Sequence, residues 1–161
     1  MEKFKVLLVD DEQDFVKSLS ERLEMRELEA RTAFNGDQAL KAVKQEQPSV
    51  IVLDLRMPGM DGLEVLRLLK KAHPEVQVII LTGHGTEKDE AEAKRLGAFA
   101  YLQKPVNLNQ LMETMRKAHK KFKSMQYNVD TMLMGAALAQ AGEPDLAREV
   151  MKERLEEEDE K

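Results

Sequence analysis

The feature that most restricts the fold of this chain is the alternation of five short apolar runs with longer segments of helical period. The runs lie at residues 5–9, 28–33, 50–53, 76–81 and 99–102. Three of them contain VLLV, VIVL and VQVIIL and are rich in Val, Ile and Leu, which is typical of parallel strands covered on both faces. The second run, ELEARTA, alternates and indicates an edge strand. Strands that alternate with helices predict an α/β fold with a doubly wound parallel sheet.

The composition limits the classes of function that need to be considered. A formal net charge of -5 argues against a general nucleic-acid binder, which normally needs a basic face. The chain has no cysteine, which excludes disulfides and thiolate metal sites. No apolar run approaches the length of a membrane span, and the opening MEKFK does not resemble a signal peptide. We therefore expect a cytoplasmic protein with no nucleic-acid or membrane partner.

Polar side chains follow four of the predicted strands. They are Asp10 and Asp11 after the first strand, Asp54 after the third, Thr82 after the fourth and Lys104 after the fifth. Ligands of an open parallel sheet bind at the carboxyl ends of its strands, where these residues are expected to meet. Three crowded carboxylates would repel each other, and a magnesium ion with its oxygen ligands removes that repulsion. The sequence therefore predicts a Mg²⁺ site at this edge.

The residue types at this edge suit phosphoryl transfer. A carboxylate beside Mg²⁺ can attack phosphorus and form an aspartyl phosphate. Lys104 supplies a mobile positive charge for a phosphoryl oxygen, and Thr82 supplies a hydroxyl donor. Gly83, which follows Thr82, leaves room for a tetrahedral group. Each of these roles thus has a candidate at a strand end.

Four motifs, in order, make the chain similar to a known family. VLLVDDE, VLDLRMPGMDGLEVL, ILTGHG and YLQKP resemble the response-regulator receiver domains of two-component signalling. The resemblance covers residues 1–123, about three quarters of the chain, and the full set of motifs is specific. It implies a flavodoxin-like (βα)₅ fold with strand order 2-1-3-4-5.

The resemblance also implies roles for individual residues of the metal site. Asp54 matches the phospho-acceptor of the family. Asp11 matches the acidic residue that binds Mg²⁺ directly, and Asp10 matches the one that usually acts through water. The backbone carbonyl of Arg56 matches the remaining protein ligand of the metal.

The switch and the partners are implied in the same way. Thr82 and Lys104 match the switch hydroxyl and the lysine of the family, and Tyr101 matches its aromatic switch residue. A sensor histidine kinase or a phosphotransfer protein is the implied phosphoryl donor, and a protein effector is the implied target. Such a protein is not a conventional enzyme, but it catalyses its own phosphorylation and dephosphorylation.

Two other classes share parts of this pattern. A flavodoxin-like FMN binder would need a first loop that accepts phosphate, and Asp10, Asp11 and Glu12 would repel it without a metal. An aspartyl-nucleophile phosphatase carries a second Asp two residues after the nucleophile, where this chain has Arg56. Both alternatives are therefore disfavoured.

Residues 124–161 are expected to form a helical extension, a helix pair interrupted at residues 141–144. Apolar residues recur at alternating intervals of three and four from Leu108 to Ala139, as in a coiled coil. One interpretation is a break near Tyr127 and Asn128, with an independent helix after it. The other is a continuous helix that pairs with a second subunit, which would make a homodimer through the last receiver helix and the tail.

Overall fold

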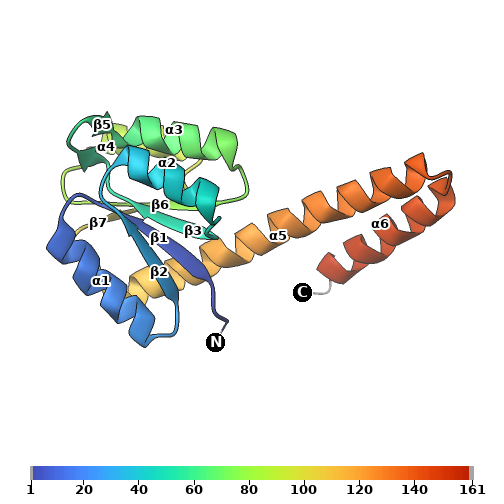
Figure 1. Ribbon diagram of the computed structural model, residues 1–161, viewed down its shortest axis with the longest axis horizontal. Helices are drawn as coiled ribbons and strands as arrows, with labels where there is room; N and C mark the ends of the chain where they lie inside the picture. The colour runs from blue at the N-terminus through green and yellow to red at the C-terminus, as the bar shows by residue number, and fades with distance from the viewer. Residues whose placement is uncertain (1, 160–161) are drawn as a thin grey trace. The chain divides into compact units, whose positions relative to one another are not determined.

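A computed structural model describes residues 2–159, with side chains up to residue 157. Its central element is a five-stranded parallel sheet (Figure 1). The main strands are β1 (Lys5–Val9), β2 (Glu29–Ala33), β3 (Val50–Leu53), β6 (Gln77–Thr82) and β7 (Ala100–Gln103). Their order is β2-β1-β3-β6-β7, which confirms the predicted order 2-1-3-4-5 because β6 and β7 are the fourth and fifth main strands.

The first four helices are α1 (Gln13–Met25), α2 (Gly36–Gln45), α3 (Gly62–Ala72) and α4 (Glu87–Arg95). The last three of them begin at a residue whose side chain caps the first turn. The side chains of Asn35 and Asp61 accept hydrogen bonds from backbone N–H groups in the first turns of α2 and α3. Thr86 and Asp89 form a reciprocal capping box at the start of α4. These contacts satisfy N–H groups that a helix leaves unpaired at its first turn.

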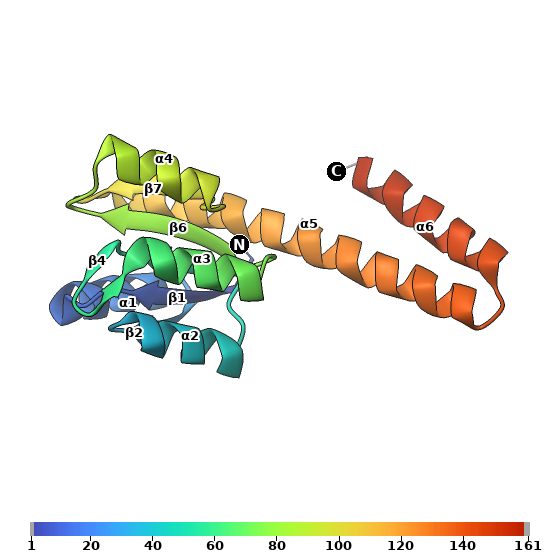
Figure 2. The same cartoon turned by 90° about the horizontal axis from the view of Figure 1, so that it is seen from above.

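Two apolar cores lie on opposite faces of the sheet. Side chains of α2, α3 and α4, among them Val43, Leu66 and Ala93, form one core with β1, β3 and β6. Side chains of α1 and of the first part of α5 (Leu108–Gln140), among them Leu23 and Met115, form the other. Figures 1 and 2 show this three-layer arrangement. Strands buried on both faces account for the unbroken apolar runs in the sequence.

A short antiparallel pair that the sequence pattern did not predict lies between β3 and α3. It consists of β4 (Arg56–Met57) and β5 (Met60–Asp61), joined by a turn with Gly59 at φ 85°. A side chain at Gly62 would overlap the backbone of Leu55, so the absence of a Cβ allows the chain to approach itself closely here. The pair holds the loop after β3 beside the strand ends.

The chain divides into two compact units at residues 122 and 123. The second unit contains the end of α5 and the whole of α6 (Pro144–Asp159). No break occurs at Tyr127 or Asn128, so the interpretation with an independent helix after them is wrong. The interruption between α5 and α6 falls at residues 141–143, with Gly142 at φ 83°. In the described part of the chain, every helix is too short or too polar to cross a membrane.

Candidate functional site

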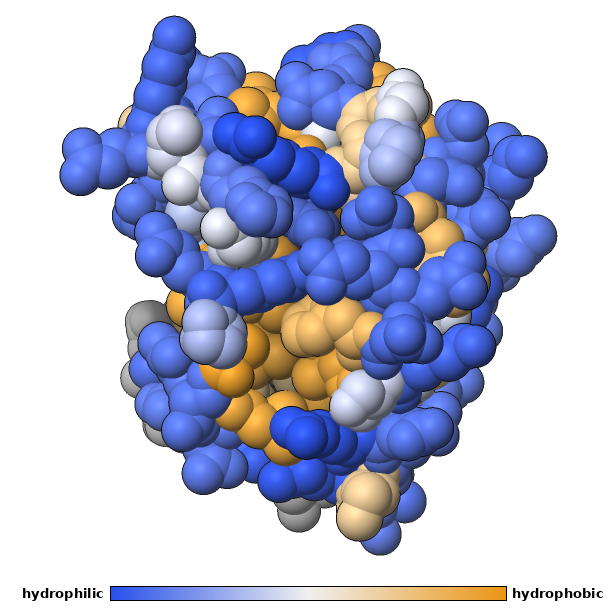
Figure 3. Space-filling view, turned by 90° about the vertical axis from the view of Figure 1, so that its left-hand side faces the viewer, coloured by the Kyte–Doolittle hydropathy of each residue, from blue (hydrophilic) through white to orange (hydrophobic). Residues whose placement is uncertain are grey.

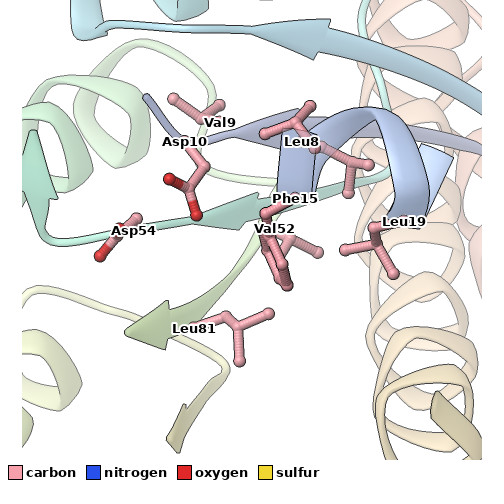
Figure 4. Close-up of a pocket in the computed structure, with 9 residues that line it drawn as sticks. Leu8, Val9, Asp10, Phe15, Leu19, Val52, Asp54 and Leu81 are labelled. Atoms are coloured by element: carbon pink, nitrogen blue, oxygen red, sulfur yellow. The ribbon is translucent and has the colours of Figure 1, made fainter. Parts of the chain in front are cut away.

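Two buried aspartates lie side by side at the carboxyl edge of the sheet. Asp10 follows β1, and its N–H donates to Ala33 O at 3.1 Å; Asp54 follows β3, and its N–H donates to Val9 O at 2.9 Å. The parallel register of β1 and β3 therefore brings these two residues to the same level. Figure 4 shows them at the end of a small pocket whose other labelled residues are apolar.

Lys104 carries the positive charge that faces both aspartates. It follows β7, where its N–H donates to Thr82 O at 3.0 Å. Its Nζ lies 2.5 Å from Asp10 Oδ2 and 3.4 Å from Asp54 Oδ2. The ammonium group also lies 4.4 Å from the centre of the Phe15 ring, a cation–π contact. The structure thus brings together Asp10, Asp54 and Lys104 from three different strand ends.

Burial and charge act in opposite directions on the pKa values of Asp10 and Lys104. Burial raises the pKa of the Asp10 carboxyl above its ordinary value, although the hydrogen bonds from Lys104 and from Glu12 N–H oppose the shift. Burial by itself would lower the pKa of the Lys104 ammonium, but the hydrogen bond and charge of Asp10 and the charge of Asp54 outweigh it and raise that pKa. Lys104 is therefore held protonated, and an additional cation would relieve the crowding of the carboxylates.

The oxygen donors at this edge fit a hard divalent cation. Carboxylate oxygens of Asp10, Glu12 and Asp54 lie within 4.8 Å of one another. A set of oxygen ligands with no nitrogen or sulfur suits Mg²⁺. Asp11 is not in this cluster of described residues; it lines a shallow groove that Arg56 also lines. The proposed metal roles of Asp11 and of the Arg56 carbonyl therefore remain predictions.

The two predicted switch residues, Thr82 and Tyr101, lie on the paired strands β6 and β7. Thr82, fully buried at the end of β6, accepts a hydrogen bond from His84 N–H at 3.4 Å. Tyr101 on β7 buries its hydroxyl, for which the described residues supply no hydrogen-bond partner. Burial, together with the charges of Asp89 and Glu90, raises the pKa of Tyr101. An unpaired buried hydroxyl is costly, so this side chain has a reason to adopt another orientation.

Gly85 makes the inward position of Tyr101 possible. A Cβ built at Gly85 would overlap the Tyr101 hydroxyl and come 2.9 Å from Cγ2 of Thr82. A Cβ at Gly83 would meet nothing closer than the Lys104 side chain at 3.8 Å, an ordinary contact. The room for the aromatic ring is therefore made at residue 85 and not at residue 83.

An apolar groove lies next to Lys104, between α1 and the start of α5. Its lining residues are Phe15, Ser18, Leu19, Arg22, Pro105, Val106, Leu108 and Leu111. Figure 3 views this end of the receiver unit and shows a hollowed apolar area enclosed by hydrophilic side chains. Exposed apolar surface of this kind is typical of contacts with other proteins.

Three residues of the site were assigned no role in metal binding or in the switch from the sequence. Glu12 belongs to the acidic run Asp10-Asp11-Glu12, and this run was the available signal for a third carboxylate. Phe15 lies on α1, 89 residues before Lys104, and its contact with that side chain can be found only once the fold is known. Gly85 carried no signal, because its importance depends on which way Tyr101 points.

Comparisons with known proteins agree with this geometry. The family model described as response regulator receiver domain matches residues 6–116. Sporulation initiation phosphotransferase F of Bacillus subtilis is 34% identical over 113 residues, which cover 70% of this chain and 91% of that protein. The putative response regulator NtrX-like of Rickettsia typhi is 33% identical over 132 residues, which cover 81% of this chain but 28% of that protein. The chain therefore spans a small part of such longer relatives.

A solved structure shows the same architecture. The CheY-like response regulator receiver domain protein of Methanospirillum hungatei superposes with a TM-score of 0.73 at 26% identity, over 77% of this chain and 99% of that one. Together with the family match, this likeness confirms the flavodoxin-like fold. The chain belongs to the response-regulator receiver domain family.

Proposed function

We propose that this chain works as a two-component response regulator that takes a phosphoryl group on Asp54. The observation that supports this most directly is the position of Lys104 Nζ, within 3.4 Å of the carboxylates of both Asp10 and Asp54. A buried acceptor, a fixed cation and a cluster of carboxylate oxygens are the components that transfer to an aspartate requires.

The chain's own residues have separate parts in this transfer. A carboxylate oxygen of Asp54 forms the new bond to phosphorus, the bond from phosphorus to the donor's leaving group breaks, and the leaving group departs with its electron pair. Lys104 neutralises a phosphoryl oxygen as charge develops. Asp10, Glu12 and Asp54, with the predicted ligands Asp11 and the Arg56 carbonyl, are the residues that would hold Mg²⁺, which neutralises charge on both reactants.

The response to phosphorylation is proposed to pass through Thr82 and Tyr101. Phosphorylation adds negative charge and acceptor oxygens, toward which the Thr82 hydroxyl moves. Tyr101 then shifts within the space beside Thr82 that Gly85 leaves open. The phosphoryl group changes the relative populations of two packings of the surface around Thr82 and Tyr101. Other proteins then recognise this surface.

The partners follow from the same chemistry. The phosphoryl donor is proposed to be a sensor histidine kinase or a phosphotransfer protein in the cytoplasm, docked at the apolar groove beside Lys104. The output is proposed to be a contact with a protein effector or with a second copy of this chain. The acidic balance of the sequence makes nucleic acid an unsuitable partner for this output.

The acceptor is tested by labelling with acetyl phosphate and Mg²⁺. The parent chain should take up one hydroxylamine-sensitive phosphate, and Asp54→Asn should take up none. The matched control is Asp37→Asn, at an exposed aspartate in the first turn of α2, which should label like the parent. Equal labelling of Asp54→Asn and the parent would refute the proposal.

The switch is tested separately with Thr82→Ala. This variant should still label at Asp54 but lose the change in the tyrosine environment that follows phosphorylation. Because Tyr127 is the second tyrosine of the chain, the measurement uses a Tyr127→Phe background. A full spectroscopic response in Thr82→Ala would exclude the proposed path.

A further inference from the structure

Exposed large apolar side chains are concentrated in the second unit. Among the described residues, seven of the eight such side chains lie there; the other is Met25. The seven are Val129, Met132, Leu133, Met134, Leu146, Met151 and Leu155. Surface of this kind is rarely left exposed in quantity unless another molecule covers it.

The contact between α5 and α6 leaves most of these side chains outside and includes only the Met151 sulfur, which lies against Gly135. Buried residues of this unit are the small Thr131, Gly135 and Ala147. Arg154 Nη1 donates to Thr131 Oγ1 at 2.9 Å, and a Cβ at Gly135 would come 2.8 Å from Met151 Sδ. A helix pair of this length with no large buried side chain among its described residues lacks a core of its own, and units below about 40 residues usually need a further source of stability.

Besides the face of α5 that contacts α6, this helix has an apolar face that α6 does not cover. Val129, Met132 and Leu133 are 52%, 66% and 64% exposed, and with Ala136 they recur at intervals of three and four. At about 100° per residue they form a face distinct from the one that carries Thr131 and Gly135. We call these four residues the α5 stripe.

The spacing of the α5 stripe indicates that its occupant is a helix. Leu111, Met115 and Ala118, which belong to the same series earlier in α5, are fully buried in the receiver unit. The series continues through Val129, Met132 and Ala136 with alternating steps of three and four residues. This is the repeat with which helices interlock side chains in a coiled coil.

The charge distribution favours an identical helix. In residues 124–142 the only charged residue is Asp130, whereas charged residues make up 34% of the whole chain. Positions that flank such a stripe select foreign partners by charge, and here they are uncharged. An uncharged face meets its own copy without like-charge repulsion, and a two-fold pairing closes on itself.

We propose that two copies of this chain pair through the α5 stripe, helix against helix. The pairing specifies one output contact that the proposed function leaves open, and it does not depend on phosphoryl transfer. The partner is a second copy of this chain, and the contact is made by Val129, Met132, Leu133 and Ala136 on each side.

The mass of the full chain in solution tests the pairing, by light scattering after size exclusion over a range of concentrations. The parent should reach twice the chain mass of 18.4 kDa. Met132→Lys should weaken dimerisation by at least about 100-fold, because each dimer would bury two added charges. Met134→Lys is the matched control, since Met134 is 41% exposed on the same helix but off the stripe, and it should dimerise like the parent.

Cross-linking provides a second readout that does not introduce a charge. The chain has no cysteine, so single Cys substitutions at Val129, Met132 and Ala136 report proximity directly. At least one of them should form an interchain disulfide under mild oxidation much faster than Met134→Cys. Both experiments are repeated in Asp54→Asn, so that failure of phosphorylation and failure of pairing are distinguished.

Several outcomes would overturn the proposal. A parent chain that stays monomeric at every concentration would do so, as would a Met132→Lys variant that dimerises like the parent. Equal loss of dimer in Met132→Lys and Met134→Lys would show that the effect is not specific to the stripe. Circular dichroism should show unchanged helix content in both variants; a dimer lost only together with α5 would also count against the pairing.

Discussion

Helix α5 carries one apolar series through two different environments. In the receiver unit, Leu111 and Met115 are fully buried against the sheet, whereas Val129 and Met132 in the second unit are more than half exposed. The spacing of apolar residues is the same in both parts, so the periodicity indicates a helix that needs a partner without saying which partner it has. Burial identifies the partner in the receiver unit as the sheet. The partner of the exposed part in the second unit is the subject of the proposed pairing.

The two units are expected to differ most in their response to the removal of Mg²⁺. Removal of Mg²⁺ with EDTA should slow the labelling of Asp54 by acetyl phosphate more than about 100-fold, because the ion neutralises the charges of the reactants. The helix content of the second unit should not change, since its described residues include no comparable acidic cluster. Phosphate-affinity electrophoresis and circular dichroism measure the two effects. Labelling at an unchanged rate in EDTA would contradict the metal assignment.

Truncation of a methionine in each part of α5 tests the difference in burial. Met115→Ala should lower the free energy of unfolding by about 2–5 kcal/mol, because it opens a cavity in the core. Met132→Ala should change it by less than about 0.5 kcal/mol when measured on the single chain. Urea denaturation at concentrations where the chain is monomeric provides both values. Similar losses for the two variants would mean that Met132 is covered within one chain.

A smaller effect is expected from Gly85→Ala in the receiver unit. The new methyl group overlaps the Tyr101 hydroxyl, so the ring must turn outward or the loop must shift, at a cost of about 1–3 kcal/mol. In the Tyr127→Phe background, iodide quenching of tyrosine fluorescence should increase. Gly83→Ala is the control, with nothing closer than 3.8 Å, and should leave quenching unchanged. If quenching in Gly85→Ala equalled that of the parent, the loop would have accommodated the methyl group without moving the ring.

The smallest effect is expected in the polar contact between α5 and α6. Arg154 donates to Thr131 and lies 4.9 Å from the centre of the Tyr127 ring. Arg154→Met should destabilise this helix pair by about 1 kcal/mol, seen as faster amide hydrogen exchange in α6. The control Arg148→Met removes an exposed arginine paired with Asp145 and should have little effect. Equal exchange in the two variants would mean that the contact contributes nothing.

The sequence predicted the features that depend on periodicity and on strand ends. The ranges 5–9 and 50–53 are β1 and β3 as expected, and the other three strands begin one residue later than predicted. Asp10 and Asp54 meet because parallel strands end at a common edge. The two-residue strands β4 and β5 were not predicted, because a pair that short leaves no periodic signal.

Features that depend on side-chain direction were beyond the sequence. Asp11 and Glu12 are neighbours in the chain, yet only Glu12 joins the cluster with Asp10, since the turn into α1 decides which carboxylate oxygen comes close to those of Asp10 and Asp54. Gly85 matters because Tyr101 points toward it. The continuity of α5 past Tyr127 was one of two open interpretations, because neither Tyr nor Asn ends a helix with certainty.

The exposure of the sulfur-containing side chains in the second unit has a chemical consequence. Met132, Met134 and Met151 are 66%, 41% and 36% exposed, whereas Met112 and Met115 are enclosed by the core. Mild peroxide should therefore convert the first group to sulfoxides well before the second, as peptide mass mapping would reveal. A sulfoxide at Met132 would make the α5 stripe polar. Pairing through this helix would then respond to oxidants independently of any phosphoryl donor.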